Sequence, residues 1–225
     1  MSKARRLGLV GGLGVGATVH YYQSLAKAHQ DNGLTLDIVI THAETSRVYE
    51  YLQADDREGL AGYLLGFIQT LHAAGAELVA IPAVTPHFCI RELVERSPIP
   101  LINLFDSLNE LAARKISRVA VFGTRFVIQS ALFGFLSDVE VISPEPEEVA
   151  LIHDIYTELA QTGAASSDHY NQLTSLAHTL CTREKLDAIL IAGTDLSLIF
   201  NEQNIDFPYI DCAALHLQDI LNRVS

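Results

Sequence analysis

The sequence has few cysteines, a shortage of basic residues and no long apolar run, and each of these excludes a class of protein. Its three cysteines (Cys89, Cys181 and Cys212) have no CxxC or CxxH spacing. The pattern therefore indicates neither a zinc site nor a disulfide framework. No apolar stretch reaches the length of about 18–20 residues needed to span a bilayer. Lys and Arg total 15 against 27 Asp and Glu, a net charge of −12, which argues against non-specific nucleic-acid binding.

The first residues also lack the features of a secretory signal. Met1–Arg6 is basic, but the apolar stretch that follows is interrupted by glycines and is more typical of a strand than of a signal-peptide core. With 225 residues, 49% apolar and 19% charged, the composition is that of a globular protein with one large or two small domains. We expect a cytoplasmic protein with neither membrane nor nucleic-acid partners.

Short apolar, β-branched runs alternate with longer helical patterns, which is typical of an α/β protein with parallel sheets. Strands buried on both faces give continuous apolar runs of this kind. The predicted strands are 6–11, 35–41, 77–82, 100–103, 118–123, 138–142 and 187–192. The predicted helices are 16–31, 56–75, 87–96, 105–114, 127–135, 145–162, 167–183, 196–203 and 212–224. Thr18, Asp106 and Asp211 lie near helix starts and could be N-caps.

The strand ends repeat along the chain. The glycine-rich segment 7–16 is echoed by 119–125, and the apolar segment 78–87 is echoed by 188–195. Ala83 follows Gly11 by 72 residues and Gly193 follows Gly123 by 70. We therefore predict two similar Rossmann-like α/β halves, 1–98 with 208–225 and 99–207. Ligands bind at the carboxyl ends of such sheets, so two facing halves related by a pseudo-twofold axis would form one cleft.

The segment Gly12-Leu13-Gly14-Val15-Gly16 invites comparison with nucleotide-binding loops. Its G-x-G-x-G spacing differs from the dinucleotide motif G-x-G-x-x-G, and no lysine follows as in a Walker A loop. What remains is a loop of backbone N–H groups that could bind an anion, a carboxylate included. The alternative is a tight strand–helix turn that only requires glycine.

Taken together, these segments resemble the aspartate/glutamate racemase superfamily nearly end to end. The resemblance includes Gly11-Gly12-Leu13, Tyr21-Tyr22, Gly75-Ala76, Gly123-Thr124-Arg125 and 211–216. A family motif of the form P-C-N-T-x-H is matched by Pro82–His87, and one of the form G-C-T-E by Ala192–Asp195. The resemblance thus implies that Ala83 and Gly193 stand where relatives carry two catalytic cysteines. It also implies a cofactor-independent, often dimeric, enzyme without a metal.

Two thiols on opposite sides of the substrate would normally remove and return a proton, and alanine and glycine cannot do this. Candidates for acid–base work are Asp195 and His87. The alternatives are that Asp195 caps the helix expected from 196, and that His87 bonds locally. Thr85 and Thr194 would donate hydrogen bonds to a carboxylate. Cys89 is expected in the core.

The remaining candidates would bind the substrate. Arg47 and Arg125 could hold a carboxylate through the guanidinium fork, or either could be a solvated surface arginine; the family resemblance favours Arg47. His216 could face the ligand or support the site. The strand-end positions expected to line the ligand are Gly12, Leu13, Gly14, Ala83, Val84, Gly123, Thr124 and Gly193.

Two functions follow from this pattern. The first is a divergent enzyme acting on a small carboxylic or amino acid by a one-base isomerase, lyase or decarboxylase route. The segment 193–197 is similar to the oxyanion loop of arylmalonate decarboxylases, and it could stabilise developing charge. The alternative is a catalytically inactive carboxylate- or amino-acid-binding protein of the same fold. Both predict a small carboxylate or amino acid as ligand, no cofactor and a homodimer.

Overall fold

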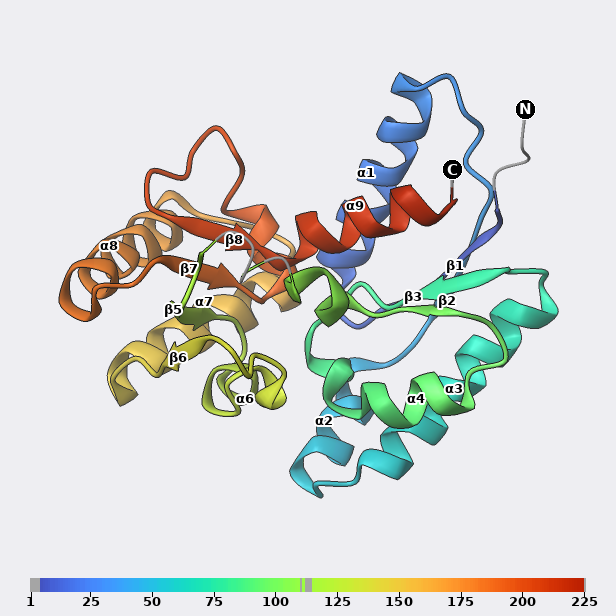
Figure 1. Cartoon of the computed structure of the whole chain (residues 1–225), viewed down its shortest axis with the longest axis horizontal. Helices are drawn as coiled ribbons and strands as arrows, with labels where there is room; N and C mark the ends of the chain where they lie inside the picture. The colour runs from blue at the N-terminus through green and yellow to red at the C-terminus, as the bar shows by residue number, and fades with distance from the viewer. Residues whose placement is uncertain (1–4, 110, 112–114, 225) are drawn as a thin grey trace. The chain divides into compact units, whose positions relative to one another are not determined.

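The computed structural model describes residues 5–109, 111 and 115–224. The chain divides into two compact units (Figure 1). Unit 1 is Met1–Leu104 with His216–Ser225, and unit 2 is Phe105–Leu215. No helix among the described residues is long and apolar enough to cross a membrane.

Unit 1 is built on a four-stranded parallel sheet of order β2-β1-β3-β4. Its strands are β1 (Leu7–Gly11), β2 (Ile38–His42), β3 (Leu78–Ala80) and β4 (Leu101–Ile102). Figure 1 shows α3 and α4 on one side of these strands and α1 and α9 on the other. The helices are α1 (Val15–Asp31), α2 (Thr45–Gln53), α3 (Arg57–Ala73), α4 (Ile90–Arg96) and α9 (Cys212–Val224), with a 3-10 turn η1 (Thr85–Cys89) before α4.

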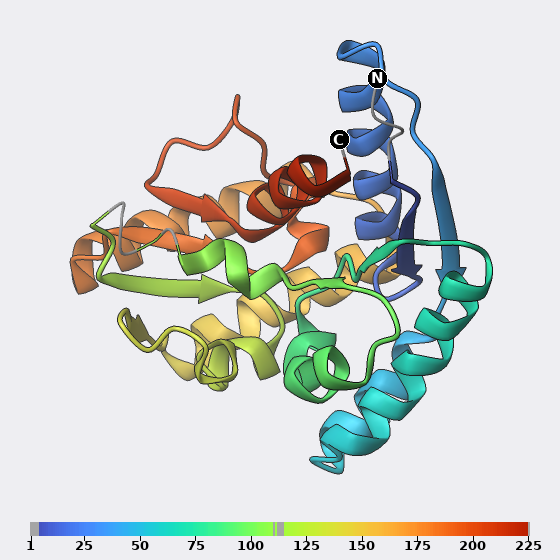
Figure 2. The same cartoon turned by 45° about the vertical axis from the view of Figure 1, so that its right-hand side comes forward.

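Unit 2 repeats this plan with a parallel sheet of order β6-β5-β7-β8. Its strands are β5 (Arg118–Phe122), β6 (Glu140–Ile142), β7 (Ala188–Ile191) and β8 (Tyr209–Asp211). Figure 2 shows the long helices α7 and α8 running along this sheet. The helical segments are α6 (Arg125–Gln129), α7 (Pro146–Thr162), α8 (Ser167–Glu184), and the 3-10 turns η2 (Leu104–Asn109), η3 (Leu132–Gly134) and η4 (Thr194–Leu198).

The same strand order in both units confirms the predicted α/β class and the internal repeat. In each sheet the second strand in sequence lies on one side of the first, and the third and fourth strands lie on the other side of it. The direction of winding therefore reverses between β1 and β3, and between β5 and β7. Ligands in open α/β sheets bind at the carboxyl ends of the strands, at this reversal. The fold thus singles out the residues after these four strands.

Several predicted elements differ from the structure. β8 and α2 were missed, because β8 has only three residues and α2 buries only Val48 and Leu52. The helix predicted at 196–203 is wrong, since η4 ends at Leu198. Part of the helix predicted at 105–114 lies outside the described residues.

Thr18 is not an N-cap, because α1 begins after Gly14 and Thr18 lies within its first turn. Asp211 is one: its Oδ1 accepts from the N–H groups of Ala213 and Ala214.

The helix predicted at 127–135 is also wrong, because the chain leaves the right-handed region there. Ala131, Leu132 and Phe133 have φ angles of 48°, 55° and 58°. A left-handed conformation costs a residue with a Cβ about 1–2 kcal/mol.

We expect Ala131→Gly to raise the free energy of unfolding by about 1 kcal/mol in urea titrations. The control Ala26→Gly, inside α1, should lower it by a similar amount; a loss at both positions would contradict the explanation.

Candidate functional site

The glycine loop after β1 is largely occupied by the protein itself. Gly12 has a φ of +86°, and its N–H donates to Oγ1 of Thr18 at 3.0 Å. Its carbonyl accepts from the hydroxyl of Thr45 at 3.0 Å. Leu13 is buried, and Gly14 accepts both the N–H and the hydroxyl of Thr18. The N–H of Gly12 is therefore already bonded to a side chain of α1. This favours a structural turn over an anion-binding loop at the Gly12 N–H.

The strand end after β3 carries a buried histidine with both ring nitrogens bonded. Nδ1 of His87 lies 2.8 Å from the carbonyl of Ala83, and Nε2 accepts the N–H of Leu104 at 3.3 Å. Burial and the neighbouring His216 lower the pKa of His87 to about 3. The backbone of Val84 accepts from the His87 N–H at 2.9 Å, and Thr85 begins η1. His87 is thus a neutral side chain that bonds locally and fixes the turn after Ala83.

His216 continues this buried cluster. Its Nδ1 lies 3.1 Å from the hydroxyl of Tyr21, and its Nε2 lies 3.1 Å from the carbonyl of Ile102. Burial lowers its pKa to about 4. Its ring centroid is 6.2 Å from that of His87. Tyr21, His87 and His216 therefore join α1, η1, α9 and the end of β4 through uncharged polar contacts.

The arginine preferred from the sequence is already paired. Nη1 of Arg47 lies 2.5 Å from Oε2 of Glu50 within the exposed helix α2. Its guanidinium also sits 5.9 Å from the centre of the Tyr51 ring. A carboxylate ligand would have to compete with Glu50, so Arg47 is the weaker of the two arginine candidates.

In unit 2 the ends of β5 and β7 approach each other closely through glycines. A Cβ on Gly123 would lie 3.0 Å from the carbonyl oxygen of Ala192, and one on Gly193 would lie 3.2 Å from Cα of Gly123. The hydroxyl of Thr124 accepts the N–H of Val127 at 3.2 Å and caps α6. Gly123 and Thr124 therefore shape the strand end, and the Thr124 hydroxyl acts as a helix cap.

The turn after β7 holds a buried polar group that the protein leaves unbonded. Thr194 and Asp195 are both buried. Oγ1 of Thr194 has no hydrogen-bond partner among the residues that the structure describes. A buried hydroxyl without a partner costs about 1–3 kcal/mol, so such groups call for an explanation. Beside it, the hydroxyl of Tyr156 donates to Oδ2 of Asp195 at 3.1 Å.

Tyr156 lies on α7, whose inner face follows the ends of three strands. Val149 and Ala150 lie beside Ser143 and Pro144, just after β6. One turn later, Nδ1 of His153 accepts the N–H of Arg125 after β5, at 3.3 Å. Tyr156 follows at the end of β7. The pKa of His153 is lowered by burial and by the charge of Arg125.

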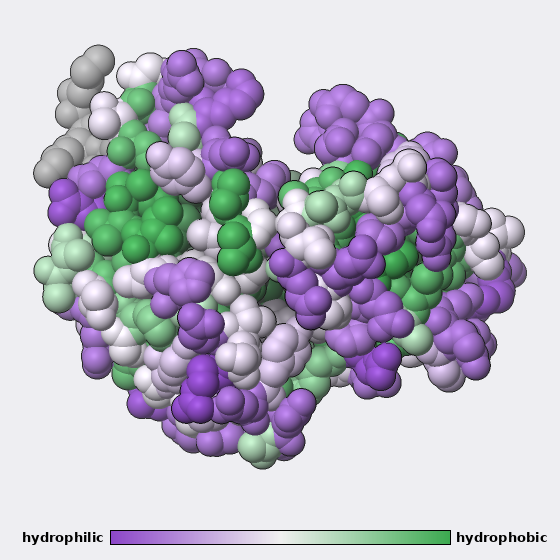
Figure 3. All heavy atoms as spheres, turned by 180° about the vertical axis from the view of Figure 1, so that it is seen from behind, coloured by the Kyte–Doolittle hydropathy of each residue, from purple (hydrophilic) through white to green (hydrophobic). Residues whose placement is uncertain are grey.

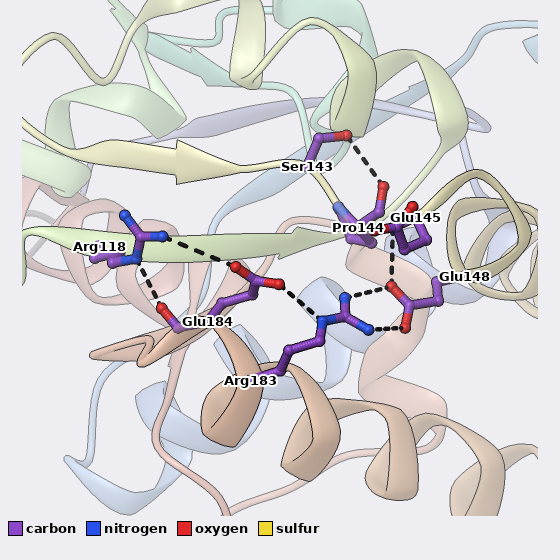
Figure 4. Close-up of polar contacts among 7 residues, drawn as sticks. All are labelled: Arg118, Ser143, Pro144, Glu145, Glu148, Arg183 and Glu184. Carbon is purple, nitrogen blue, oxygen red and sulfur yellow. Dashed lines mark hydrogen bonds and ion pairs between the residues drawn. The ribbon is translucent and has the colours of Figure 1, made fainter.

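The start of α7 is fixed by an ion-pair network (Figure 4). Arg183, near the end of α8, binds both carboxylate oxygens of Glu148 at 2.8 and 2.9 Å. Glu148 also accepts the N–H of Glu145 at 2.8 Å, one half of a capping box. Glu184 joins the network by accepting from Arg183, and its carbonyl accepts Nε of Arg118 at 2.7 Å. The hydrogen bond from Arg183 lowers the pKa of Glu148.

Arg125 lines a pocket that lies wholly within unit 2. The pocket has a volume of about 360 Å³ and polar side chains from Gln129 and Ser143. Apolar groups complete it: Pro144, Pro146, Val149 and Ala150. Pockets of this size are typical of small-ligand sites. Elsewhere, no three His, Cys, Asp or Glu side chains among the described residues form a group that could hold a metal ion.

Comparison with known proteins decides the family. The model of the Asp/Glu/hydantoin racemase family matches residues 10–220. The chain belongs to this family.

Solved structures of related fold include a candidate Asp/Glu racemase from Yersinia pestis (21% identity, TM-score 0.81, covering 97% of this chain and 98% of that one). An aspartate racemase homologue from Pyrococcus horikoshii matches at 20% identity and a TM-score of 0.79, over 97% and 98% of the two chains. Glutamate racemase from Aquifex pyrophilus matches at 13% and 0.62, over 98% and 84%.

Within this racemase-family fold, Cys89 and Cys212 are buried and Cys181 is partly buried. Cys89 is in the core, where burial raises its pKa to about 12 and its Sγ donates to the carbonyl of Pro86. Sequence reasoning missed Tyr156 and His153. The signal for them was the helical spacing of the buried positions 149, 152, 156 and 159, which shows that this face of α7 points inward.

Proposed function

We propose that this racemase-family chain is a cytoplasmic enzyme that binds a small carboxylic or amino acid after β7 and exchanges its α-proton by a one-base route. The observation that carries the proposal is the buried, unbonded hydroxyl of Thr194. It lies between Gly193, which has no side chain, and Asp195, a buried carboxyl. A ligand oxygen that accepts from Thr194 would remove the cost of that unpaired hydroxyl.

The proposed chemistry needs one proton acceptor. The carboxylate of Asp195 takes the α-proton, and the electron pair of the broken C–H bond passes into the ligand carboxylate. The hydroxyl of Thr194 stabilises the added negative charge by donating a hydrogen bond. In D₂O the protonated Asp195 exchanges its proton with solvent and returns a deuteron to the same face of the carbon, which gives exchange with retention of configuration. Return of the proton to another carbon of the delocalised ligand gives the isomerised product. His87 is neutral and bonded at both ring nitrogens, so we do not assign it the role of a second acid.

Arg125 is proposed to hold a carboxylate of the ligand. Arg125 lines the pocket described above together with Gln129 and Ser143. Arginine suits this role because its planar fork matches a carboxylate. The proposal transfers to Arg125 the role that the sequence assigned first to Arg47, whose charge is engaged by Glu50.

Solvent exchange tests the function. The enzyme is incubated in D₂O with D- and L-aspartate, D- and L-glutamate and malonate, and NMR follows loss of the α-proton signal. We expect exchange with at least one probe, and Asp195→Asn should slow it about 100-fold or more. Saturable binding without exchange would instead support the inactive binding protein. Exchange unchanged in Asp195→Asn would refute the assignment of the base.

A stability measurement tests the Thr194 observation separately. We expect Thr194→Val to leave the melting temperature unchanged or higher, because it removes a buried hydroxyl that bonds nothing in the ligand-free protein. The same change should weaken binding of the active probe about tenfold. Thr124→Val is the control, and it should cost about 1 kcal/mol because it removes the cap of α6. A comparable loss in both variants would mean that Thr194 has a structural partner.

We also propose a homodimer formed through unit 1. Five exposed large apolar side chains lie on α1, on the loop after it and on β2: Val15, Val19, Tyr22, Leu34 and Ile40. Another, Val94, lies on α4. Figure 3 shows hydrophobic residues reaching the surface on the rear face of the molecule. Val15, Val19 and Tyr22 follow one face of α1 at helical spacing, as an interface helix would. Sedimentation should show a dimer that Val19→Glu converts to monomer, whereas a monomeric wild type would contradict this proposal.

A further inference from the structure

The Tyr156 ring occupies the space beside Gly193. A Cβ at position 193 would lie 2.6 Å from Cε2 and 2.7 Å from Cδ2 of Tyr156. Real Cβ atoms essentially never approach other heavy atoms this closely. The backbone of Gly193 is not the obstacle, since its φ of −118° and ψ of 106° suit any residue. The closest obstacle to a side chain at position 193 is therefore the Tyr156 ring, with Cα of Gly123 second at 3.2 Å, and the backbone angles of the turn do not themselves require glycine.

The ring has little room to move aside. Tyr156 is 8% exposed, and its neighbours on the inner face of α7, Ile152 and Leu159, are fully buried. The Arg183–Glu148 ion pair fixes the start of the same helix. The hydroxyl of Tyr156 is engaged by Asp195 at 3.1 Å. Packing and hydrogen bonding thus agree on one orientation for this side chain.

We propose that Tyr156 is the positioning residue of this site: its ring takes the space that a side chain at 193 would need, and its hydroxyl orients Asp195. The claim about the ring is the packing half of the proposal, and the claim about the hydroxyl is the positioning half. The positioning half rests on the proposed function of Asp195, whereas the packing half does not. Because a carboxylate that accepts a hydrogen bond is held in one rotamer, Tyr156 would act on the rate of proton transfer through Asp195 without touching the ligand.

A double-mutant cycle tests the packing half by thermal unfolding. Gly193→Ala should lower the melting temperature by roughly 5 °C or more, as an overpacked site does. Tyr156→Ala should also lower it, because it opens a cavity. In the double variant the combined loss should be smaller than the sum, since the new methyl group enters the vacated space. Additive losses would overturn the packing half.

Gly66→Ala provides the matched control for this cycle. Gly66 lies within α3, and a Cβ there would meet nothing within 4 Å. Alanine is the better helix former, so the variant should match or exceed the wild-type melting temperature. Its effect should simply add to that of Tyr156→Ala.

Kinetics in D₂O test the positioning half, with the aspartate, glutamate and malonate probes. Tyr156→Phe keeps the ring and loses the hydroxyl, so it should lower the maximal exchange rate about tenfold with an unchanged half-saturation concentration. An unchanged rate, or a raised half-saturation concentration alone, would overturn the positioning role. If the wild type exchanges no probe, the proposed function and the positioning half fail together, while the melting cycle still decides the packing half.

Discussion

Replacing Gly12 by alanine is expected to lower the free energy of unfolding by about 3 kcal/mol or more. The new Cβ would lie 2.4 Å from the carbonyl oxygen of Ala43 and 2.9 Å from its nitrogen. The φ of +86° would add strain to any residue with a Cβ. Both contacts are with backbone, so the segments that follow β1 and β2 would have to separate. Urea titration of the purified variant measures the loss.

Gly33→Ala separates the two causes of that loss. Gly33 also has a positive φ, +66°, but a Cβ there would meet nothing within 4 Å. It should therefore show only the backbone cost of about 1 kcal/mol. Equal losses at Gly12 and Gly33 would mean that the close approach of Ala43 has no energetic consequence.

The second large effect is a loss of stability between pH 6.5 and pH 5. His87 and His216 have pKa values lowered by burial to about 3 and about 4, against an ordinary 6.5. The folded chain therefore keeps both neutral, while the unfolded chain binds two more protons below pH 6.5. Stability is fully present above pH 6.5 and falls as the pH drops towards the folded values. Well below pH 6.5 the slope approaches about 2.7 kcal/mol per pH unit.

Urea titrations at pH 7, 6, 5.5 and 5 measure this slope. His216→Gln should reduce the number of protons bound on unfolding by about one, because it removes one of the two buried imidazoles. The lowered pKa values of Glu148 and Asp187 act in a lower range, because their ordinary values are 4.5 and 3.8. A slope unaffected by His216→Gln would show that the buried cluster does not cause the acid sensitivity.

The sequence predicts the sheets of this protein better than the ends of its helices. Apolar runs such as 188–191 give continuous burial, which identifies a parallel strand from local composition alone. The left-handed turn at 131–133 has no such signature, because no glycine precedes Gly134 there. β8 was missed because it has only three residues, which follow Pro208 and end in the helix cap Asp211, and these carry too little pattern to identify a strand.

The candidate site shows the same limit. Gly193, Thr194 and Asp195 could be selected because they follow a strand at a repeated spacing. Tyr156 could not, since its contact with Asp195 joins positions 39 residues apart. The competing roles of His87 also depended on distant groups: its second ring nitrogen meets the backbone of Leu104. Local sequence selects the strand ends, but the partners that set each group's charge and orientation come from tertiary packing.

The division of the chain into its two units has a consequence for synthesis on the ribosome. Unit 2 is continuous from Phe105 to Leu215, whereas unit 1 needs residues from both sides of it. For example, the hydroxyl of Tyr21 can form its hydrogen bond only when His216, 195 residues later in the sequence, has been synthesised. The segment translated first is thus completed last, and until α9 emerges the nascent chain presents an unfinished apolar surface on unit 1. Chaperone binding during translation should accordingly favour the early segment over the later, self-contained one.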